Sequence, residues 1–380
     1  MNGRFFLPTR IHFGPGTLRE LSHEVGAGQR VMVVTDPGLL KLGLVEKVAS
    51  IIKEAGGRAV VFSDVEANPH ASTVTAARAI LQQEKADLVI GLGGGSPMDV
   101  AKALSFLATN DGPLEDYQWQ GRQIVNPPLP FIAVATTAGT GSEVTRTAVI
   151  VDRDTKQGII SDALFPRVAI VDPELQLGLP PLLTATTGMD ALTHAAEAYI
   201  GLRRSPFTDA WSLEAIKLVS RFLLRAFANG RDLPAREGMA VASTLAGAAM
   251  DQGGLGVVHA LAGPLSSHYD VPHGLANAVL LADGLVFNEP VARERLAHLA
   301  VVLGVVSPGA TPRQAAYAFI QWVREMTEDL GLVGTLRRYA IPASHLETIG
   351  QEAAAMGLIR NNPRQASGKD CATIYSKVIA

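Results

Sequence analysis

The feature that most constrains the fold of this chain is a change of pattern near residue 178. Before that point, five short runs rich in β-branched residues alternate with stretches of helical periodicity, and these runs cover residues 30–36, 59–65, 86–92, 130–136 and 168–172. Such alternation predicts a mostly parallel sheet covered by helices. Beyond residue 178 the β-branched runs stop, and long amphipathic stretches predict an all-helical second half. These stretches cover residues 209–228, 235–250, 292–303 and 315–330.

The same change of pattern predicts two domains. A chain of 380 residues is longer than one hydrophobic core usually supports. Gly178 and Leu179 precede two prolines, Pro180 and Pro181, which end a strand and cannot continue a helix. We therefore expect an α/β domain at residues 1–178 and an all-helical domain at residues 179–380.

Composition favours a small-molecule partner. The formal net charge is −3 with basic and acidic residues interspersed, a pattern that does not favour nucleic acid or an anionic membrane as partner. A single cysteine, Cys371, rules out an internal disulfide and any multi-cysteine metal site, and favours a reducing cytoplasm. With no leader-like start and no run of about 18 apolar residues, we expect a soluble, unprocessed chain.

A glycine-rich turn follows the third of these strands. Residues 86–92 lead into Gly93, Gly94 and Gly95, whose backbone N–H groups can approach an anion closely. Ser96 is expected to cap the following helix, with Pro97 at its first position. A glycine turn is also often only a tight connection, so by itself it leaves phosphate binding open.

A second polar turn occupies residues 136–145, after the strand that ends near Ala135. Two such turns at neighbouring strand ends would form a crevice for a dinucleotide. Asp36 ends the first strand, where a carboxylate can accept hydrogen bonds from ribose hydroxyls and repel a 2′-phosphate, which favours NAD over NADP. The alternative for Asp36, which precedes Pro37, is a turn-forming role. The turn carries five hydroxyls, those of Thr136, Thr137, Thr140, Ser142 and Thr145.

A carboxylate and three imidazoles in the second half form a candidate metal site. Asp190 and His194 are four residues apart on an expected helix, so their side chains share one face. His259 lies in an apolar helical stretch, and His273 follows a proline. This donor set suits Fe²⁺, Zn²⁺ or another divalent metal, with a position left for substrate. His268 is left outside the ligand set, as a candidate for approaching the substrate.

At these motifs the chain resembles the iron-containing, or group III, alcohol dehydrogenases, which include lactaldehyde reductases and propanediol dehydrogenases. The resemblance spans nearly the whole chain and is strongest at residues 93–97, 136–145, 172–173 and 190–194 and at the pair His259 and His273. It implies a dehydroquinate synthase-like fold, with an N-terminal dinucleotide domain, an all-helical C-terminal domain and the active site in the cleft between them. It also implies a homodimer.

The resemblance assigns roles to individual residues. Asp190, His194, His259 and His273 match the positions that hold a divalent ion, usually Fe²⁺. Gly263 departs from the family pattern, because many members have a histidine there, and Met250 replaces a frequent aromatic residue. Leu358 falls in a region that resembles the edge of the substrate pocket. The contacts to NAD fall on Asp36, Asn68, Gly94, Gly95, Ser96, Asp99, Thr136, Thr137, Thr140, Ser142, Thr145 and Lys156.

The sequence therefore favours a metal-dependent enzyme that transfers a hydride between NAD(H) and a small alcohol or aldehyde. The metal would lower the pKa of the alcohol oxygen, as zinc does for bound water. The alternatives are a maleylacetate reductase-like enzyme, a metal lyase of the dehydroquinate synthase type, and a non-catalytic nucleotide or metal sensor. The physiological substrate is not specified by these residues.

Overall fold

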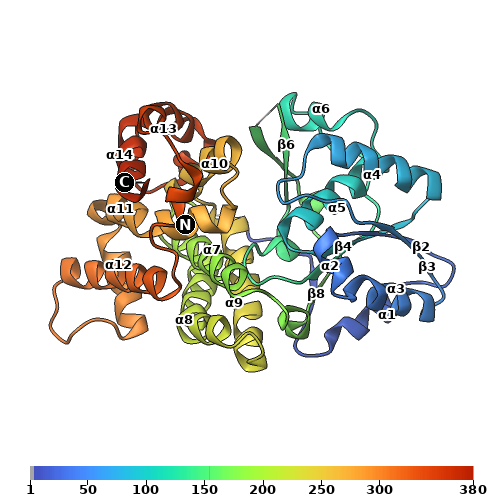
Figure 1. Ribbon diagram of the computed structural model, residues 1–380, viewed down its shortest axis with the longest axis horizontal. Helices are drawn as coiled ribbons and strands as arrows, with labels where there is room; N and C mark the ends of the chain where they lie inside the picture. Colours follow the sequence, from blue (N-terminus) through green and yellow to red (C-terminus); the bar gives the residue numbers. More distant parts are fainter. Residues whose placement is uncertain (1–3, 154, 380) are drawn as a thin grey trace. The chain divides into compact units, whose positions relative to one another are not determined.

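The computed structural model describes residues 4–153 and 155–379, which form two compact units (Figure 1). One unit spans residues 6–178. The other contains the described residues from Leu179 onward together with Arg4 and Phe5. The ring of Phe5 packs against Phe207 and Trp211, so this N-terminal segment associates with the helical unit, whereas the sequence had assigned it to the α/β domain.

A parallel six-stranded sheet forms the centre of the first unit, in the order β1-β8-β5-β4-β2-β3. The five predicted strand runs are all present, and the predicted α/β class is confirmed. The edge strand β1 was not predicted, because its four residues are exposed or only partly buried and show no apolar run. The strands are β1 (Arg10–Phe13), β2 (Arg30–Val34), β3 (Arg58–Phe62), β4 (Leu88–Gly93), β5 (Phe131–Ala135) and β8 (Val168–Val171).

Helices bury both faces of this sheet, which explains why its inner strands are apolar along their whole length. Along β2, Val31 and Val33 belong to one buried cluster, whereas Met32 and Val34 belong to the other. The first cluster is covered by η1 (Thr17–Glu20), α1 (Leu21–Glu24), α2 (Pro37–Lys41) and α3 (Leu44–Glu54). The second is covered by α4 (Ala71–Glu84), α5 (Gly95–Leu107) and α6 (Leu114–Trp119).

A two-stranded antiparallel hairpin, β6 (Thr147–Asp152) and β7 (Thr155–Ile160), lies outside the main sheet. The sequence did not predict it. Along β6, half-buried residues largely alternate with buried ones, and Gln118 of α6 anchors the hairpin by donating to the carbonyls of Ile150 and Gln157 at 3.0 and 3.1 Å. Short 3-10 turns complete the unit: η2 (Ser142–Val144), η3 (Asp162–Leu164) and η4 (Pro173–Gln176).

The second unit is helical throughout residues 179–379, as predicted. The four predicted amphipathic stretches fall on α8, α9, α11 and α12. The long helices are α7 (Pro181–Ile200), α8 (Pro206–Ala228), α9 (Leu233–Gly253), α10 (Val257–Tyr269), α11 (His273–Leu303), α12 (Pro312–Asp329), α13 (Leu346–Ala355) and α14 (Gly368–Ile379). Three short 3-10 helices join them: η5 (Thr335–Tyr339), η6 (Ala343–His345) and η7 (Gly357–Asn361).

Helices α7 and α11 form the interior of this unit. Every residue of α7 from Gly188 to its end is buried. Among the described residues, one helix, α11, is long and apolar enough to cross a membrane, judged by its length and composition alone. Because 67% of its apolar window is buried and it packs against α7, α10 and α12, we interpret it as a core helix.

Candidate metal centre and dinucleotide turns

Four side chains from three helices converge inside the helical unit. Asp190 and His194 lie on α7, His259 on α10, and His273 is the first residue of α11. Their ligand-type atoms lie within 4.8 Å of one another, and the Nε2 of each histidine is 3.8 Å from Asp190 Oδ1. His273 is the partly exposed member, with 39% of its side chain accessible. The structure thus brings together the residues that the sequence singled out.

The Pro-His-Gly sequence at the start of α11 explains how His273 reaches the other three residues. Pro272 is the N-cap of the helix, so His273 occupies the first turn. Gly274 lets α11 approach α7 closely, because a Cβ at this position would lie 2.6 Å from the backbone oxygen of Thr186. A larger residue would force the two helices apart.

Glu197 supports the cluster and was missed in the sequence. It is buried on α7, and its Oε2 lies 2.7 Å from His259 Nδ1. Its carboxylate also accepts the backbone N–H groups of Gly256 and Val258, at 3.0 and 2.7 Å. With the Nδ1 proton held by Glu197, the Nε2 lone pair of His259 faces Asp190. The spacing was the available signal, because Glu197 follows His194 by three residues on the same helix face.

The electrostatics of Asp190 keep a negative charge in this buried place. Burial would raise the pKa of Asp190, but the imidazoles of His194, His273 and His259 lower it below its ordinary value, helped by a hydrogen bond from Asn277. An ionised carboxylate beside three nitrogen donors is a set that suits Fe²⁺ or Zn²⁺. The residues present therefore fit a divalent metal.

Asn277, one turn after His273, was also missed. Its Nδ2 lies 2.7 Å from Asp190 Oδ1 and 3.1 Å from the Nε2 atoms of His259 and His273. The side chain is fully buried, and no donor among the described residues reaches its Oδ1. An orphaned buried oxygen beside converging nitrogen lone pairs is a further feature that fits a site built for a cation.

In the first unit, the order of the strands marks a second candidate site. The chain passes from β2 outward to β3 and then returns to place β4 on the other side of β2. The helices after β2 and β4 lie on opposite faces of the sheet. Ligands of open α/β sheets bind at such a switch point, beside the carboxyl ends of the strands. Asp36 follows β2 there, and the glycine turn follows β4.

The two predicted turns contact each other at this edge. Thr136 N–H donates to the Gly93 carbonyl at 3.0 Å. A Cβ on Gly94 would lie 3.2 Å from Thr137 Oγ1, and a Cβ on Gly95 would lie 3.1 Å from Thr140 Cγ2. We call the surface formed by Gly94, Gly95, Thr137 and Thr140 the cradle. Its walls are so close that side chains on the glycines would collide with the threonines.

The expected role of Ser96 as a helix cap is wrong. Helix α5 begins at Gly95 with Gly94 as its N-cap, and no side chain caps it, so Pro97 is the third helical residue and not the first. The extended backbone of Gly94 lets the helix start earlier than a serine cap would. Ser96 Oγ instead donates to the Ala67 carbonyl at 2.6 Å, which ties the glycine turn to the loop that carries Asn68.

Asp36 has the turn-forming role that the sequence left open. Its Oδ1 accepts the N–H groups of Gly38 and Leu39, at 2.8 and 3.2 Å, and so caps α2. Among the residues that the structure describes, none donates a hydrogen bond to its Oδ2. The cap therefore leaves one carboxylate oxygen for another ligand.

The predicted cofactor residues Asp99, Ser142 and Thr145 are hydrogen-bonded to one another or to Lys102 within this unit. Asp99 Oδ1 accepts from Ser142 Oγ at 3.2 Å, and its Oδ2 accepts from Val149 N at 3.2 Å. Ser142 and Thr145 are buried. Burial raises the pKa of Asp99 to about 6, although the charges of Lys102 and Lys156 oppose the shift. Lys156, on β7, is therefore near enough to influence Asp99.

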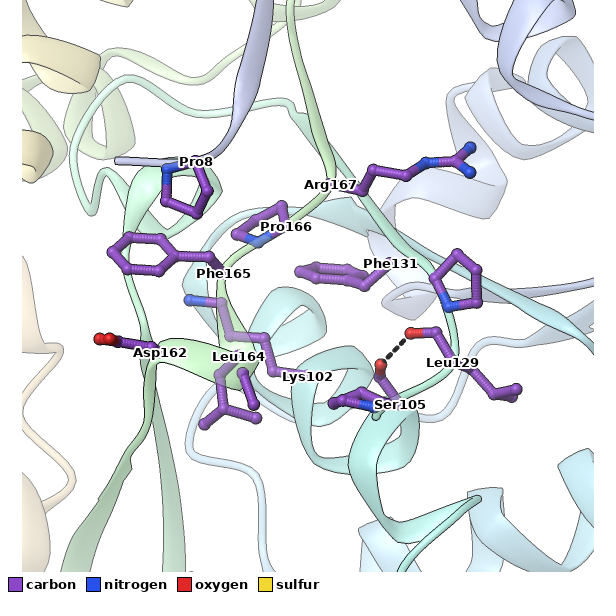
Figure 2. A pocket seen from close by; sticks show the side chains of 13 residues that line it. Pro8, Lys102, Ser105, Leu129, Phe131, Asp162, Leu164, Phe165, Pro166 and Arg167 are labelled. Carbon is purple, nitrogen blue, oxygen red and sulfur yellow. Dashed lines mark hydrogen bonds between the residues drawn. The ribbon is translucent and has the colours of Figure 1, made fainter. Parts of the chain in front are cut away.

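A cavity of about 290 Å³ lies at the opposite end of the strands, where β5 and β8 begin (Figure 2). Phe131 and Arg167, which line it, stand where β5 and β8 begin. Its polar groups have partners within the unit, because Ser105 Oγ donates to Leu129 O at 2.5 Å and Arg167 pairs with Glu24. This cavity is separate from the two turns, which follow the strand ends.

Two family models match the chain almost end to end. A model described as "Iron-containing alcohol dehydrogenase" matches residues 8–173, and one described as "Fe-containing alcohol dehydrogenase family, C-terminal" matches residues 184–379. The chain belongs to the iron-containing alcohol dehydrogenase family. The NAD-dependent methanol dehydrogenase of Bacillus methanolicus is 37% identical over 380 residues, which cover 99% of each chain. The chain is thus an iron-type alcohol dehydrogenase, a metal-dependent oxidoreductase.

Solved structures of iron-containing alcohol dehydrogenases share the whole fold. The structure of 1,3-propanediol oxidoreductase is 37% identical, covers 100% of both chains and has a TM-score of 0.94. A sulfoacetaldehyde reductase from Bifidobacterium kashiwanohense, solved in complex with NAD⁺, is 30% identical with a TM-score of 0.91 and covers 100% of this chain and 99% of its own. This likeness confirms the predicted fold class.

Gly263 and His268 both lie on α10, the helix that carries His259. A Cβ on Gly263 would lie 2.9 Å from Met356 Sδ, so this thioether occupies the space that a side chain at position 263 would enter. His268 does not join the four-residue cluster. Its Nε2 is paired with Glu352 Oε2 at 2.6 Å, and 37% of its side chain is exposed.

Proposed function

We propose that this enzyme transfers a hydride between NAD(H) and a small alcohol or aldehyde, with the unit at residues 6–178 binding the dinucleotide and the helical unit that begins at residue 179 binding the metal. The observation that carries the proposal is the cluster of Asp190 with three histidines, in which Glu197 is hydrogen-bonded to His259. Membership of the iron-containing alcohol dehydrogenases supports the reaction class. A small alcohol suits the names of the methanol and 1,3-propanediol relatives.

In the proposed site, Asp190, His194, His259 and His273 hold the divalent ion, with Fe²⁺ as the expected metal. When bound, such an ion acts as a Lewis acid toward the alcohol oxygen and lowers the pKa of its hydroxyl. Glu197 keeps His259 in the tautomer that offers Nε2. Asn277 orients the Asp190 carboxylate through its hydrogen bond to Oδ1.

NAD is the proposed hydride carrier, and the cradle is the proposed binding site of its pyrophosphate. The family relatives whose names mention NAD support this choice. Backbone N–H groups at the start of α5 and the hydroxyls of Thr137 and Thr140 would face the phosphates. Asp36 would bind the adenosine ribose. The remaining proposed contacts to NAD come from Asn68, Ser96, Thr136 and Lys156. We propose that these contact residues are held in place by Asp99, Ser142 and Thr145.

For the proton that leaves the alcohol, His268 is our candidate carrier. It lies on α10, the helix of His259, and its partly exposed ring is paired with Glu352. Gly263 offers no side chain for this task. A His268→Ala variant should lose activity in alcohol oxidation, with the metal content unchanged.

The test is anaerobic purification followed by metal analysis and an assay of NADH formation from short primary alcohols. Bound iron and steady NADH production would support the proposal. Phosphate release from a phosphorylated substrate without net NADH would instead indicate the lyase, and NADH formation from alcohols that persists after complete metal removal would indicate a metal-independent reductase. Nucleotide binding without turnover of any alcohol would indicate a sensor.

We also propose a cytoplasmic homodimer. The one cysteine, Cys371, is buried as a thiol, which suits a reducing compartment. Phe13 of the edge strand β1 is 65% exposed, and an exposed apolar edge is a place where a second copy can add. Light scattering during size-exclusion chromatography measures the mass directly, and a mass of one chain, about 40.1 kDa, would contradict the dimer.

A further inference from the structure

A lysine is fully buried behind the two turns. Lys102 lies on α5, two turns beyond the glycine turn, and none of its surface is exposed. Its Nζ donates to Ser142 Oγ at 2.8 Å, to Thr145 Oγ1 at 3.0 Å and to the Thr147 carbonyl at 2.9 Å. Figure 2 shows its side chain extending from the helix beside the cavity at the amino edge of the sheet.

An ammonium group in such a position needs a reason, because removing a charge from water costs several kcal/mol per ion before its partners compensate. A methionine could fill a similar volume with no charge to satisfy. The charge does something that packing cannot: it fixes three oxygens from the second turn and the start of β6 around one point.

Asp99 completes the network from the same helix. It precedes Lys102 by three residues, and its Oδ1 accepts from the same Ser142 hydroxyl, at 3.2 Å. Its Oδ2 accepts from Val149 N, so it also binds β6. Ser142 is therefore held between a cation and a carboxylate on one helix face, which fixes both its position and the direction of its O–H bond.

This network controls how the second turn lies against the glycine turn. Helix α5 carries the glycine turn at its N-terminus and Lys102 in its middle. Thr137 and Thr140 belong to the same turn as Ser142, and they lie 3.2 and 3.1 Å from the Cβ positions of Gly94 and Gly95. A shift of a few tenths of an ångström at Ser142 would widen or narrow the cradle.

We propose that Lys102 is a positioning residue for the dinucleotide: through Ser142 and Thr145 it sets the width of the cradle without touching the cofactor. The proposal rests on the proposed function, in which the cradle binds the pyrophosphate. It predicts that loss of the lysine weakens NAD binding, while the metal centre in the other unit keeps its metal.

The experiment compares Lys102→Met with the parent enzyme. Because the cradle would lose its fixed width, we expect KM for NAD and the dissociation constant of NADH to rise by about tenfold, which corresponds to about 1.4 kcal/mol of binding free energy. With NAD saturating, kcat should stay within about twofold, since a residue that acts on cofactor binding leaves the metal chemistry intact. NADH fluorescence gives the dissociation constant, and metal analysis gives the iron content.

Asn110→Ala is the matched control. Asn110 is another buried polar residue of the same unit, and it bonds the Phe106 carbonyl and the backbone of residues 125 and 126. Its loss should lower thermal stability without changing the NADH dissociation constant. If Lys102→Met fails to fold, Ser142→Ala keeps the lysine and removes the shared hydroxyl, and it should raise the same constant by a smaller factor.

The outcomes separate the two proposals. An unmodified enzyme that binds no NADH would overturn the proposed function. If the unmodified enzyme binds NADH and the Lys102 or Ser142 variant binds it equally tightly, the role of Lys102 is overturned and the proposed function stands. Equal weakening in Asn110→Ala would also overturn it, because general loosening of the unit would then explain the effect.

Discussion

Glu197 Oε2 lies 2.7 Å from Nδ1 of His259, and the same carboxylate accepts two backbone N–H groups at the start of α10. One side chain of α7 therefore fixes the first turn of α10, the orientation of an imidazole on it and the tautomer of that imidazole. Carboxylates placed behind metal-binding histidines act in this way and raise the basicity of the ring. The position of His259 in the cluster depends on this contact.

Glu197→Gln should weaken metal binding by about 10–100-fold, because loss of a carboxylate partner behind a metal-binding histidine has that cost. In the glutamine variant, an NH₂ group replaces one carboxylate oxygen. It would face at least one of the three N–H groups that now donate to Glu197. Competition between the protein and a chelator of known affinity measures the change. Glu289→Gln is the control, since Glu289 is also a buried carboxylate of this unit but pairs with Arg293. Equal affinities in Glu197→Gln and the parent would refute the role.

Gly274→Ala should weaken metal binding without removing any ligand. The added methyl group would lie 2.6 Å from the Thr186 carbonyl, so α11 must shift away from α7 and carry His273 with it. We expect a loss of about 1–3 kcal/mol in stability, typical of overpacking, together with a lower iron content. Gly357→Ala serves as control, because its new methyl group would meet nothing within 4 Å. A Gly274→Ala enzyme with parental stability and iron content would contradict the argument.

The sequence predicted those strands and helices whose own residues show a clear pattern of apolar positions. Strands such as β2 and β4 are buried on both faces, so their residues form continuous apolar runs, and helices such as α12 show one apolar face. Strand β1 escaped prediction because its four residues show no apolar run, whereas β6 carries a β-branched run at residues 147–151 that the prediction overlooked. Helix α5 began earlier than expected because Gly94, and not Ser96, is its N-cap, and a glycine cap has no side chain that would mark it in the sequence.

The residues of the candidate site also fall into two groups: those that local spacing reveals and those whose role depends on how the helices pack. Asp190 and His194 could be found from a four-residue spacing, which places them together on any helix. Glu197 and Asn277 have equally good spacings, at three residues from His194 and four from His273, but their importance depends on how α7, α10 and α11 cross. Lys102 is further from prediction, because its three partners lie 40 to 45 residues away along the chain.

Asp99 should make stability depend on pH between about 4 and 6. Burial raises the pKa of Asp99 from its ordinary value of 3.8 to about 6 in the folded protein. As the pH falls from 7 toward 5, the folded protein binds a proton that the unfolded chain does not yet bind, so this group adds stability at lower pH. Its contribution is lost as the pH rises through 6 and is constant above about pH 7. Asp99→Asn removes this dependence.

The measurement is the difference in melting temperature between the parent and Asp99→Asn at several pH values, because the other titrating groups cancel in that difference. The parent should gain on the variant as the pH falls from 7 to 5. A difference that is flat, or that changes in the opposite direction, would show that Asp99 ionises at its ordinary pKa.

The last prediction concerns Asp36, which caps α2 through Oδ1 and is proposed to select NAD. A carboxylate about 4 Å from a 2′-phosphate would repel it by on the order of 1–4 kcal/mol, between the limits for water and for a protein surface. Asp36→Ser keeps an oxygen for the cap and removes the charge, so kcat/KM with NADP should rise by about tenfold or more with little change in melting temperature. Asp36→Ala should gain NADP activity in the same way but lose about 1 kcal/mol of stability with the cap. Unchanged preference for NAD in both variants would mean that Asp36 is a helix cap and nothing more.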